Sequence, residues 1–538
     1  MTGDLRVEVD QPDGGAVLDQ LVKDDVAPAL ARKDTSLWGP DAESEAAVRL
    51  GWVDLPQTSR PLLAEIDALR ADFRQEGLDH VVLAGMGGSS LAPEVIAATA
   101  RVELTVLDST DPGVVRRALA DRLERTVLVV SSKSGTTVET DSQRRAYLQA
   151  FAEAGIDGPS RMVVVTDPGS PLAKIAESEG YRKVFHADPD VGGRYSALTA
   201  FGLVPAGLAG VDTADLLDEA EAVAADLAAS SPSNPALALG AALGAAHQLG
   251  REKVVLAEGA TSIRGFAAWA EQLIAESTGK RGLGLLPVDV GRSTAQTPGW
   301  ATAGPDATPV AIGTPEHPVE GQIITDGPLG AMFFLWETAV AVAGRVIGIN
   351  PFDQPDVEEA KRQARSLLDS PGTGDGLPRA WAEGAVEVYA EPDTLGGARS
   401  LDHLFGSLRQ LVRPTGYLAV QAYLDRDADA DVAKLRDLVA AGSGVQTTFG
   451  WGPRFLHSTG QYHKGGHRDG AFVQITGDVR EDLAVPDRPY TFGQLQRAQA
   501  AGDARVLVKT GRPVVRLHLT DRPAGIRQLL ESAGKANS

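Results

Sequence analysis

Two stretches of the chain combine glycines, hydroxyl side chains and backbone amides in a way that could hold an anion. The first, Ala84 to Ser90 (AGMGGSS), follows a short β-branched run. Glycines let backbone N–H groups approach an anion closely, and the positive end of a following helix favours the anion further. The stretch lacks the spacing of a dinucleotide fingerprint and has no Walker lysine. Alone it is a weak signal, because most glycine-rich turns between a strand and a helix serve packing.

The second stretch, Ser131 to Thr140 (SSKSGTTVET), follows another β-branched run. Its hydroxyl groups, its lysine and the amides of a helix start are groups that bind phosphate in proteins. The alternative is a serine-rich turn that caps a helix. Two such loops on strands of one sheet favour a phosphate site over two unrelated turns.

A regular alternation of strand-like and helix-length segments begins at His80. The strands and helices of this alternation must hold both loops in place. Five short β-branched runs occupy His80–Ala84, Glu103–Leu107, Thr126–Val130, Arg161–Val165 and Arg182–His186. Strands that alternate with helices predict a parallel sheet covered on both faces. Ligands bind at the carboxyl ends of such strands, which is where both loops lie.

Two further units follow the first. The second has strand-like runs at Lys253–Ala257, Leu285–Val290 and Val310–Gly313, with a helix over Arg264–Ser277. The clearest linker is PGTGDG at 371–376, and strand-like runs follow it at Val386–Ala390, Tyr417–Tyr423, Ala471–Thr476 and Val514–Leu519. We therefore predict an α/β fold in four parts: a helical N-terminal segment (1–75), a phosphate-binding unit (76–230), a second unit (231–370) and a C-terminal α/β region (377–538).

Composition limits the class of protein. The 538 residues are too many for one ordinary core, and 43% of them are hydrophobic, which is typical of a globular chain. The net charge of −21 argues against nucleic acid as a partner, because a phosphate backbone needs basic patches. The absence of cysteine excludes disulfides, thiolate catalysis and cysteine-ligated zinc.

No segment predicts export or membrane insertion. The N-terminus carries acidic Asp4 and no apolar core, so we expect no signal peptide. The most apolar long run, Ala331–Ile349, contains Glu337 and Arg345, so we expect a buried helix rather than a membrane span. These features lead us to expect a cytoplasmic protein without a membrane partner.

The two loops and three further motifs together resemble the phosphoglucose isomerase family, which has the sugar isomerase (SIS) fold. The three motifs are Gly192–Ser196 (GGRYS), Glu276–Lys280 (ESTGK) and Phe352–Lys361 (FDQPDVEEAK), the last with Asp356 in place of the family's glycine. All of them occur in family order and cover roughly residues 76 to 365. The resemblance implies two SIS-like three-layer domains with parallel sheets, plus the C-terminal α/β region.

The resemblance also implies an activity, the interconversion of glucose 6-phosphate and fructose 6-phosphate in a homodimer without a metal or an organic cofactor. Such an isomerisation needs a general base beside the carbonyl and positive charge over the enediolate oxygen. By resemblance Glu276 is the base, and partial burial can raise the pKa of such a carboxyl towards working pH. Arg194 is then the residue over the enediolate, Gln354 contacts the sugar, and Lys361 assists ring opening.

The phosphate group of the sugar is expected at the two loops. The residues assigned to substrate and phosphate binding there are Gly87, Gly88, Ser89, Ser132, Lys133, Ser134, Thr137 and Glu139. Without the resemblance the catalytic candidates have plainer interpretations. Glu276 would be a solvated helix residue, Arg194 a salt-bridged structural arginine and Lys361 a surface lysine.

One motif departs from the family order. In bacterial members the histidine that opens the sugar ring lies in a Leu-His-Ser-x-Gly-Gln segment between the last two motifs, but that interval here contains only His317. The matching segment, Leu456–Gln461 (LHSTGQ), comes roughly a hundred residues after Lys361. A permuted second half or an added third domain would return His457 to the pocket. In ordinary members this histidine crosses a dimer interface, and the pattern here resembles the isomerase part of transaldolase–phosphoglucose isomerase fusions.

His457 has two other interpretations. It could be a merely packed residue, or it could join His463, His467, Lys464 and Arg468 around a metal ion. No compact carboxylate–histidine ligand set accompanies these residues, so we expect no metal site.

Two alternatives for the whole chain also stay open. A non-catalytic sensor of sugar phosphates would need the two loops but not Glu276, Arg194 or Lys361. An isomerase that also accepts mannose 6-phosphate would need all of them, and the sequence does not separate it from one that does not.

Overall fold

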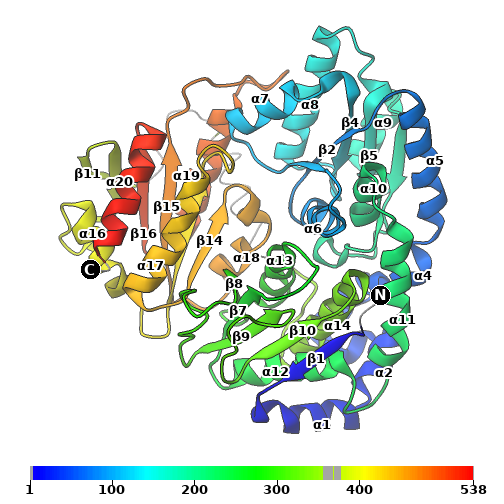
Figure 1. The fold of residues 1–538 in the computed structure, drawn as a ribbon, viewed down its shortest axis with the longest axis horizontal. Helices are drawn as coiled ribbons and strands as arrows, with labels where there is room; N and C mark the ends of the chain where they lie inside the picture. Colours follow the sequence, from blue (N-terminus) through cyan, green and yellow to red (C-terminus); the bar gives the residue numbers. More distant parts are fainter. Residues whose placement is uncertain (1–3, 356–367, 369–376, 537–538) are drawn as a thin grey trace.

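Three sheets, each flanked by helices, organise the chain (Figure 1). The structure is a computed structural model and describes residues 4–355, 368 and 377–536. In Figure 1 the C-terminal region, coloured yellow to red, lies beside both the blue-to-cyan first sheet and the green second sheet. Side chains of the C-terminal region share a hydrophobic cluster with each of these two sheets, so the three parts pack together.

The first sheet has the strand order β3-β2-β4-β5-β6, and all its strands are parallel. The strands are β2 (His80–Gly85), β3 (Thr105–Leu107), β4 (Thr126–Ser131), β5 (Met162–Thr166) and β6 (Lys183–His186). The central strands β2, β4 and β5 are buried along their whole length, as expected of a parallel sheet covered on both faces. All five strands predicted here from the sequence are confirmed.

The second sheet has the order β1-β10-β9-β7-β8. Its parallel strands are β7 (Lys253–Glu258), β8 (Leu286–Arg292), β9 (Ala307–Ile312) and β10 (Ile323–Asp326), and β1 (Arg6–Val9) pairs antiparallel with β10. The sequence predicts only helices before residue 76, so β1 is a correction, and β10 is an additional strand. Each has 4 residues, too few for alternation to distinguish a strand from a turn.

The third sheet belongs to the C-terminal region and has the order β11-β12-β16-β15-β13-β14. Its strands are β11 (Arg379–Glu383), β12 (Val386–Ala390), β13 (Tyr417–Tyr423), β14 (Thr447–Trp451), β15 (Gly470–Gly477) and β16 (Val514–Leu519). Strands β13 to β16 are parallel, and β11 and β12 extend one edge antiparallel. The four strand-like runs predicted in this region are confirmed, and β11 and β14 are additional.

Helices surround the sheets. Up to the end of the first sheet's region they are α1 (Gly15–Lys23), α2 (Val26–Ala31), α3 (Pro40–Ala46), α4 (Leu55–Thr58), α5 (Pro61–Gln75), α6 (Leu91–Ala100), α7 (Pro112–Ala120), α8 (Val138–Glu153), α9 (Pro171–Ser178) and α10 (Ala200–Ala209). The second sheet has α11 (Thr213–Leu227), α12 (Pro235–Gln248), α13 (Phe266–Thr278) and α14 (Leu329–Ile347). The C-terminal region has α16 (Leu401–Ser407), α17 (Leu435–Ser443), α18 (Gly460–Gly465), α19 (Phe492–Lys509) and α20 (Arg522–Lys535).

Helix α14 is long and apolar enough to cross a membrane by length and composition, and no other helix among the described residues is. Within the protein 83% of its most apolar window is buried, and its side chains join the main hydrophobic cluster. Glu337 of α14 has no exposed surface, and burial raises its pKa well above the ordinary value. The helix therefore lies in the protein core, as the sequence predicts.

A buried lysine joins the second sheet to the C-terminal region. Lys253, the first residue of β7, has no exposed surface, and its Nζ lies 2.5 Å from Glu252 Oε1 and 3.0 Å from Asp306 Oδ2. From the C-terminal region, Asp469 Oδ2 lies 3.2 Å from the same Nζ, and the carbonyl oxygen of Thr415 accepts a hydrogen bond from it. Three carboxylates therefore surround one buried ammonium group at this boundary.

A second ionic cluster joins the C-terminal region to the first sheet. Arg454, three residues before His457, donates to Asp108 Oδ2 at 2.6 Å and to Glu94 of α6. Arg426 Nη1 lies 3.3 Å from Asp108 Oδ1 and donates to Glu94 as well. The cluster seats the segment that carries His457 against the first sheet.

Replacement of Lys253 by methionine should destabilise the protein, because Glu252, Asp306 and Asp469 lose the ammonium group that lies between them. Removal of one partner from a buried ion pair typically costs about 3–5 kcal/mol, and a loss of that size should lower the urea midpoint of unfolding clearly. Arg125→Met is the control, because Arg125 and its partner Asp79 are both exposed, and its midpoint should hardly move. Equal midpoints for the two variants would show that the buried cluster does not stabilise the boundary.

Candidate active site

A cavity of about 460 Å³ lies between the loops that follow β2 and β4, helix α13 and the C-terminal region. The predicted site residues that line it are Gly87, Gly88, Ser89, Ser132, Lys133, Ser134, Thr137, Glu139, Glu276, Gln354 and His457. Arg194 lies next to its wall, since it contacts two of the lining residues, Glu276 and Gln354. Lys361 lies outside the described residues.

The loop after β2 packs tightly against two other backbone segments. Gly87 has φ +55°, and a Cβ there would lie 2.6 Å from the carbonyl oxygen of His457. A Cβ on Gly88 would lie 2.1 Å from the carbonyl oxygen of Gly193. Side chains at these positions would push away the segments that carry Arg194 and His457. The glycines therefore serve close packing, and they also line the cavity.

The loop after β4 gathers hydroxyl groups at one end of the cavity. Ser132 Oγ lies 3.0 Å from Thr137 Oγ1, and Ser134 Oγ lies 3.0 Å from Thr136 Oγ1. Thr137 is the N-cap of α8, yet its side chain makes no capping hydrogen bond. The first-turn amides of α8 therefore have no side-chain acceptor from this cap, and a helix N-terminus in that state favours an anion.

Lys133 is tethered at the rim of the cavity. Its Nζ lies 2.8 Å from Asp167 Oδ2 and donates to the carbonyl oxygen of Pro189 at 3.2 Å. Burial raises the pKa of the Asp167 carboxyl, although Lys133 opposes that effect. The ammonium group is thus held beside the hydroxyl-rich loop.

Glu276 is buried at the last turn of α13 beside a guanidinium group. Its Oε2 lies 3.3 Å from Arg194 Nη1, and its Oε1 accepts from Gln272 Nε2 at 3.3 Å. Burial raises the pKa of the Glu276 carboxyl, while Arg194 and the Gln272 hydrogen bond act in the opposite direction. A partly paired carboxylate with a raised pKa is a suitable general base.

Arg194 is fixed by the loop that carries Gln354. Its Nη2 donates to the carbonyl oxygens of Pro351 and Asp353, each at 2.9 Å, and its Nη1 donates to Gln354 Oε1 at 3.2 Å. Lys280 holds the same loop, because its Nζ donates to Asp353 Oδ1 at 2.6 Å. Burial and the nearby Arg194 lower the pKa of Lys280 to about 8. The GGRYS, ESTGK and FDQ motifs therefore meet at one point.

His457 comes from the C-terminal region of the same chain. Its Nε2 lies 3.0 Å from Glu139 Oε1, and its carbonyl oxygen accepts from Gln272 Nε2 at 3.0 Å. A carboxylate accepts hydrogen bonds, so a neutral imidazole that donates to Glu139 does so from Nε2 and presents the lone pair of Nδ1. Glu139 thus contacts the histidine, whereas the sequence assigns it to phosphate or substrate binding.

The other histidines do not converge on His457. His463 is buried, its Nδ1 lies 3.0 Å from Tyr417 Oη, and burial lowers its pKa well below the ordinary value. His467 pairs with Glu252 at 2.8 Å, and His317 is exposed and away from the cavity lining. These side chains therefore form no shared ligand set.

One group among the described residues does have metal-ligand spacing, and it lies elsewhere. His80, Glu103 and Asp121 offer ligand atoms within 4.8 Å of one another. Arg122 already bonds both carboxylates of this group. The group is thus an ion-paired cluster at the edge of the first sheet.

Some cavity residues are missed by the sequence reasoning. Gln272 lies one turn before Glu276 on α13, and this i, i+4 spacing is a signal that could have identified it. Lys464, Leu495 and Gln499 also line the cavity. They come from α18 and α19, far along the chain, and no spacing rule connects them to the other motifs.

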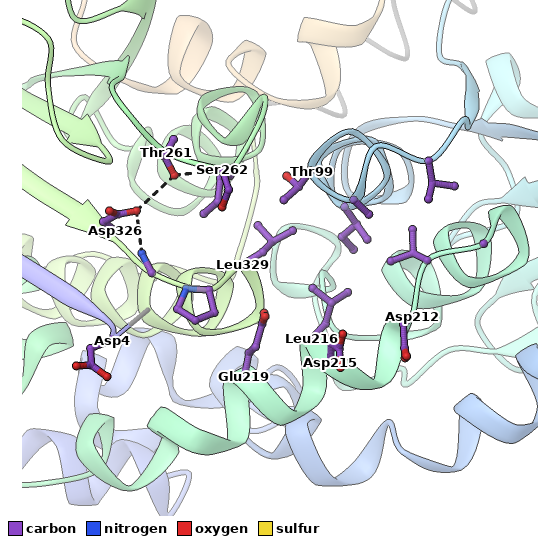
Figure 2. A pocket seen from close by; sticks show the side chains of 18 of the residues that line it. Asp4, Thr99, Asp212, Asp215, Leu216, Glu219, Thr261, Ser262, Asp326 and Leu329 are labelled. Atoms are coloured by element: carbon purple, nitrogen blue, oxygen red, sulfur yellow. Dashed lines mark hydrogen bonds between the residues drawn. The ribbon is translucent and has the colours of Figure 1, made fainter. Parts of the chain in front are cut away.

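A larger cavity of about 900 Å³ lies beside α6, α11 and α14 (Figure 2). Its carboxylates, labelled in Figure 2, are Asp4, Asp212, Asp215, Glu219 and Asp326. Its described lining contains no lysine or arginine. A phosphate ester would be repelled by this charge, so the smaller cavity is the better candidate for a phosphorylated ligand.

Known proteins resemble this chain over much of its length. Residues 70–297 match the family described as phosphoglucose isomerase. A probable glucose-6-phosphate isomerase of Natronomonas pharaonis is 30% identical over 378 residues, which cover 61% of this chain and 87% of that protein. The glucose-6-phosphate isomerase of Symbiobacterium thermophilum is 30% identical over 395 residues, which cover 60% of this chain and 87% of that protein.

A solved structure shares the fold. The crystal structure of a glucose-6-phosphate isomerase from Chlamydia trachomatis matches with a TM-score of 0.55 and 19% identity, over 67% of this chain and 86% of that chain. The motifs, the sheets that position them and the relatives agree, and this chain belongs to the phosphoglucose isomerase family.

Proposed function

We propose that this chain interconverts glucose 6-phosphate and fructose 6-phosphate. The observation that carries the proposal is the contact of Glu276 with Arg194 beside a cavity bordered by two phosphate-type loops. The family supports the same reaction. A sensor that only binds sugar phosphates is not favoured, because it would need neither the buried carboxylate nor its arginine.

Glu276 carries the proton between the two carbons. The ionised carboxylate takes the proton from C2 of the open-chain aldose, and the electrons of that C–H bond form the C1=C2 double bond while O1 becomes negative. The proton of the O2 hydroxyl then passes to O1. As C2=O2 forms, C1 takes back the proton from Glu276. The ketose results, and no atom is gained or lost.

Arg194 stabilises the intermediate. Its guanidinium group is buried and lies 3.3 Å from the base, so it is close to the charge that develops on the enediolate. Four contacts with the loop of residues 350–354 and with Glu276 hold it in place before the substrate binds. A preorganised charge of this kind lowers the barrier more than a mobile one.

His457 opens the sugar ring. With its proton on Nε2, bonded to Glu139, the imidazole can accept the proton of the O1 hydroxyl on Nδ1. The C1–O5 bond then breaks, O1 becomes the carbonyl oxygen, and the proton on Nδ1 passes to O5, so no proton is gained or lost. Assistance from Lys361 remains a prediction, because that residue lies outside the described part of the chain.

The loops after β2 and β4 bind the phosphate. Hydroxyl groups of Ser132 and Thr137, the amides at the start of α8 and the nearby Lys133 provide donors for a dianion. A homodimeric state, a cytoplasmic location, the absence of nucleic-acid and membrane partners and the resemblance to transaldolase fusions all remain predictions.

Glu276→Gln should separate the base from the ring opener. The amide keeps the size of the side chain but cannot take a proton, so kcat should fall by about 10²–10⁴-fold, and exchange of the C2 proton with deuterated water should stop. His457→Ala should be impaired on the cyclic sugar yet retain exchange on an open-chain one. NMR detection of exchange checks both variants. Normal exchange in Glu276→Gln would identify another base, and a fully active His457→Ala would show that His457 is structural.

Alanine at both Ser132 and Thr137 should weaken phosphate binding. Each hydroxyl donor to a charged group contributes about 1.5–3 kcal/mol, so KM should rise by at least tenfold while the unfolding midpoint changes little. Ser160→Ala is a matched control, because the Ser160 hydroxyl is exposed and bonds only within its own turn. An unchanged KM for the double variant would remove this loop from the phosphate site.

Co-refolded mixtures of Glu276→Gln and His457→Ala chains should stay inactive. In the structure Glu276 and His457 of the same chain line one cavity. Each site of a mixed assembly would therefore still lack one of the two residues, whichever chains are combined. Enzyme assays after unfolding and joint refolding check this. Restored activity would show that the C-terminal region completes the site of a partner chain instead.

A further inference from the structure

Glu139 has a second contact, which comes from the C-terminal region. Gln499 of α19 donates from Nε2 to Glu139 Oε1 at 2.7 Å, and this oxygen is the one that His457 Nε2 contacts. Both Glu139 and Gln499 are nearly fully buried, with 4% and 3% of their surface exposed. A buried amide at this distance from a carboxylate oxygen limits where the carboxylate can turn.

Thr110 sets the orientation of that amide. Its hydroxyl, which is fully buried near the end of β3, donates to Gln499 Oε1 at 2.8 Å. With the amide oxygen so engaged, the NH₂ group of Gln499 faces Glu139. A chain of directed hydrogen bonds therefore runs from Thr110 through Gln499 and Glu139 to His457.

We propose that Gln499 is a positioning residue of the isomerase reaction, acting through Glu139 on the ring-opening histidine. The inference rests on the proposed function. Terminal torsions of glutamate are broad, so each hydrogen bond to the carboxylate narrows the orientations that it samples. The amide of Gln499 fixes Oε1, and Oε1 fixes the Nε2–H tautomer and the plane of the His457 ring.

The position of Gln499 follows from the packing of α19 against the first sheet. Helix α19 begins at Phe492, which joins the hydrophobic cluster of the first sheet, and two turns later it places Gln499 at the cavity. Both the histidine and the residue that orients its carboxylate partner therefore come from residues beyond 377. The C-terminal region therefore supplies two of the residues proposed to act in ring opening, His457 and Gln499.

Gln499→Met tests the proposal, with Gln496→Met as the matched control. Methionine keeps the length of the side chain and removes the amide. Gln496 lies on the same helix and is equally buried, with 3% exposed, but its Nε2 has no hydrogen-bond partner. Loss of the residue that orients a metal-ligating histidine typically lowers metal affinity or activity by about 10–100-fold, and we take the same range for His457. We expect that fall in kcat on glucose 6-phosphate for Gln499→Met, with KM unchanged, and near-normal kinetics for Gln496→Met.

A second readout distinguishes positioning from a general structural effect. A four-carbon aldose 4-phosphate has its O4 esterified and has no ring to open, so exchange of its C2 proton depends on Glu276 but not on His457. Gln499→Met should exchange this proton at the rate of the unmodified enzyme. Equal losses of ring-dependent turnover and of exchange would overturn the proposal, as would equal kinetics for the two methionine variants.

Failure of the proposed isomerase function would be recognised by a different result. If the unmodified enzyme isomerises no hexose 6-phosphate, the proposed function fails before any variant is compared. If Gln499→Met does not fold, Thr110→Val decides, because it leaves Gln499 in place and removes only the hydroxyl that orients it. A ring-specific loss in Thr110→Val supports the proposal, and unaltered turnover overturns it.

Discussion

Close approach of three backbone segments at Gly87 and Gly88 is the constraint on which the candidate site depends. The carbonyl oxygens of His457 and Gly193 occupy the space where side chains of these two residues would begin. Because the contacts are backbone to backbone, no change of rotamer could make room for a side chain. The first sheet, the arginine segment and the C-terminal region thus share one fixed point, and the cavity is built around it.

Burial of the Glu276 carboxylate at this point opposes folding but makes the group a better base. A carboxyl whose pKa is raised in the folded state, as that of Glu276 is, binds its proton more tightly there than in the unfolded chain. Above the unfolded pKa its ionised form therefore subtracts from stability, and the penalty disappears as the pH falls below that value. The hydrophobic clusters around the three sheets offset this penalty. The Glu276 carboxylate is thereby held as a base with a raised pKa at the wall of the cavity.

Much of this arrangement follows from local sequence, and the rest does not. Runs such as HVVLAG and TVLVVS predict buried parallel strands, and the glycines and hydroxyl groups that follow these runs predict the two loops that line the cavity. Short edge strands such as β1 are not predictable in this way, because 4 residues are too few to show the two-residue alternation of a strand. The contact of Gln499 with Glu139 is unpredictable for a different reason. Gln499 is separated from it by 360 positions, and only tertiary packing brings a lone glutamine of an ordinary helix to a particular carboxylate.

The pairing of β1 with β10 has a consequence for folding during synthesis. Val9 pairs with Ile323, so β1 is synthesised long before β10 and has no partner until most of the second sheet has been made. Closing so long a loop is entropically unfavourable and slow compared with local helix formation. Until then its backbone donors and acceptors form an open edge of the kind that pairs with other chains. The nascent protein therefore depends on keeping β1 unpaired with other chains until β10 has been translated.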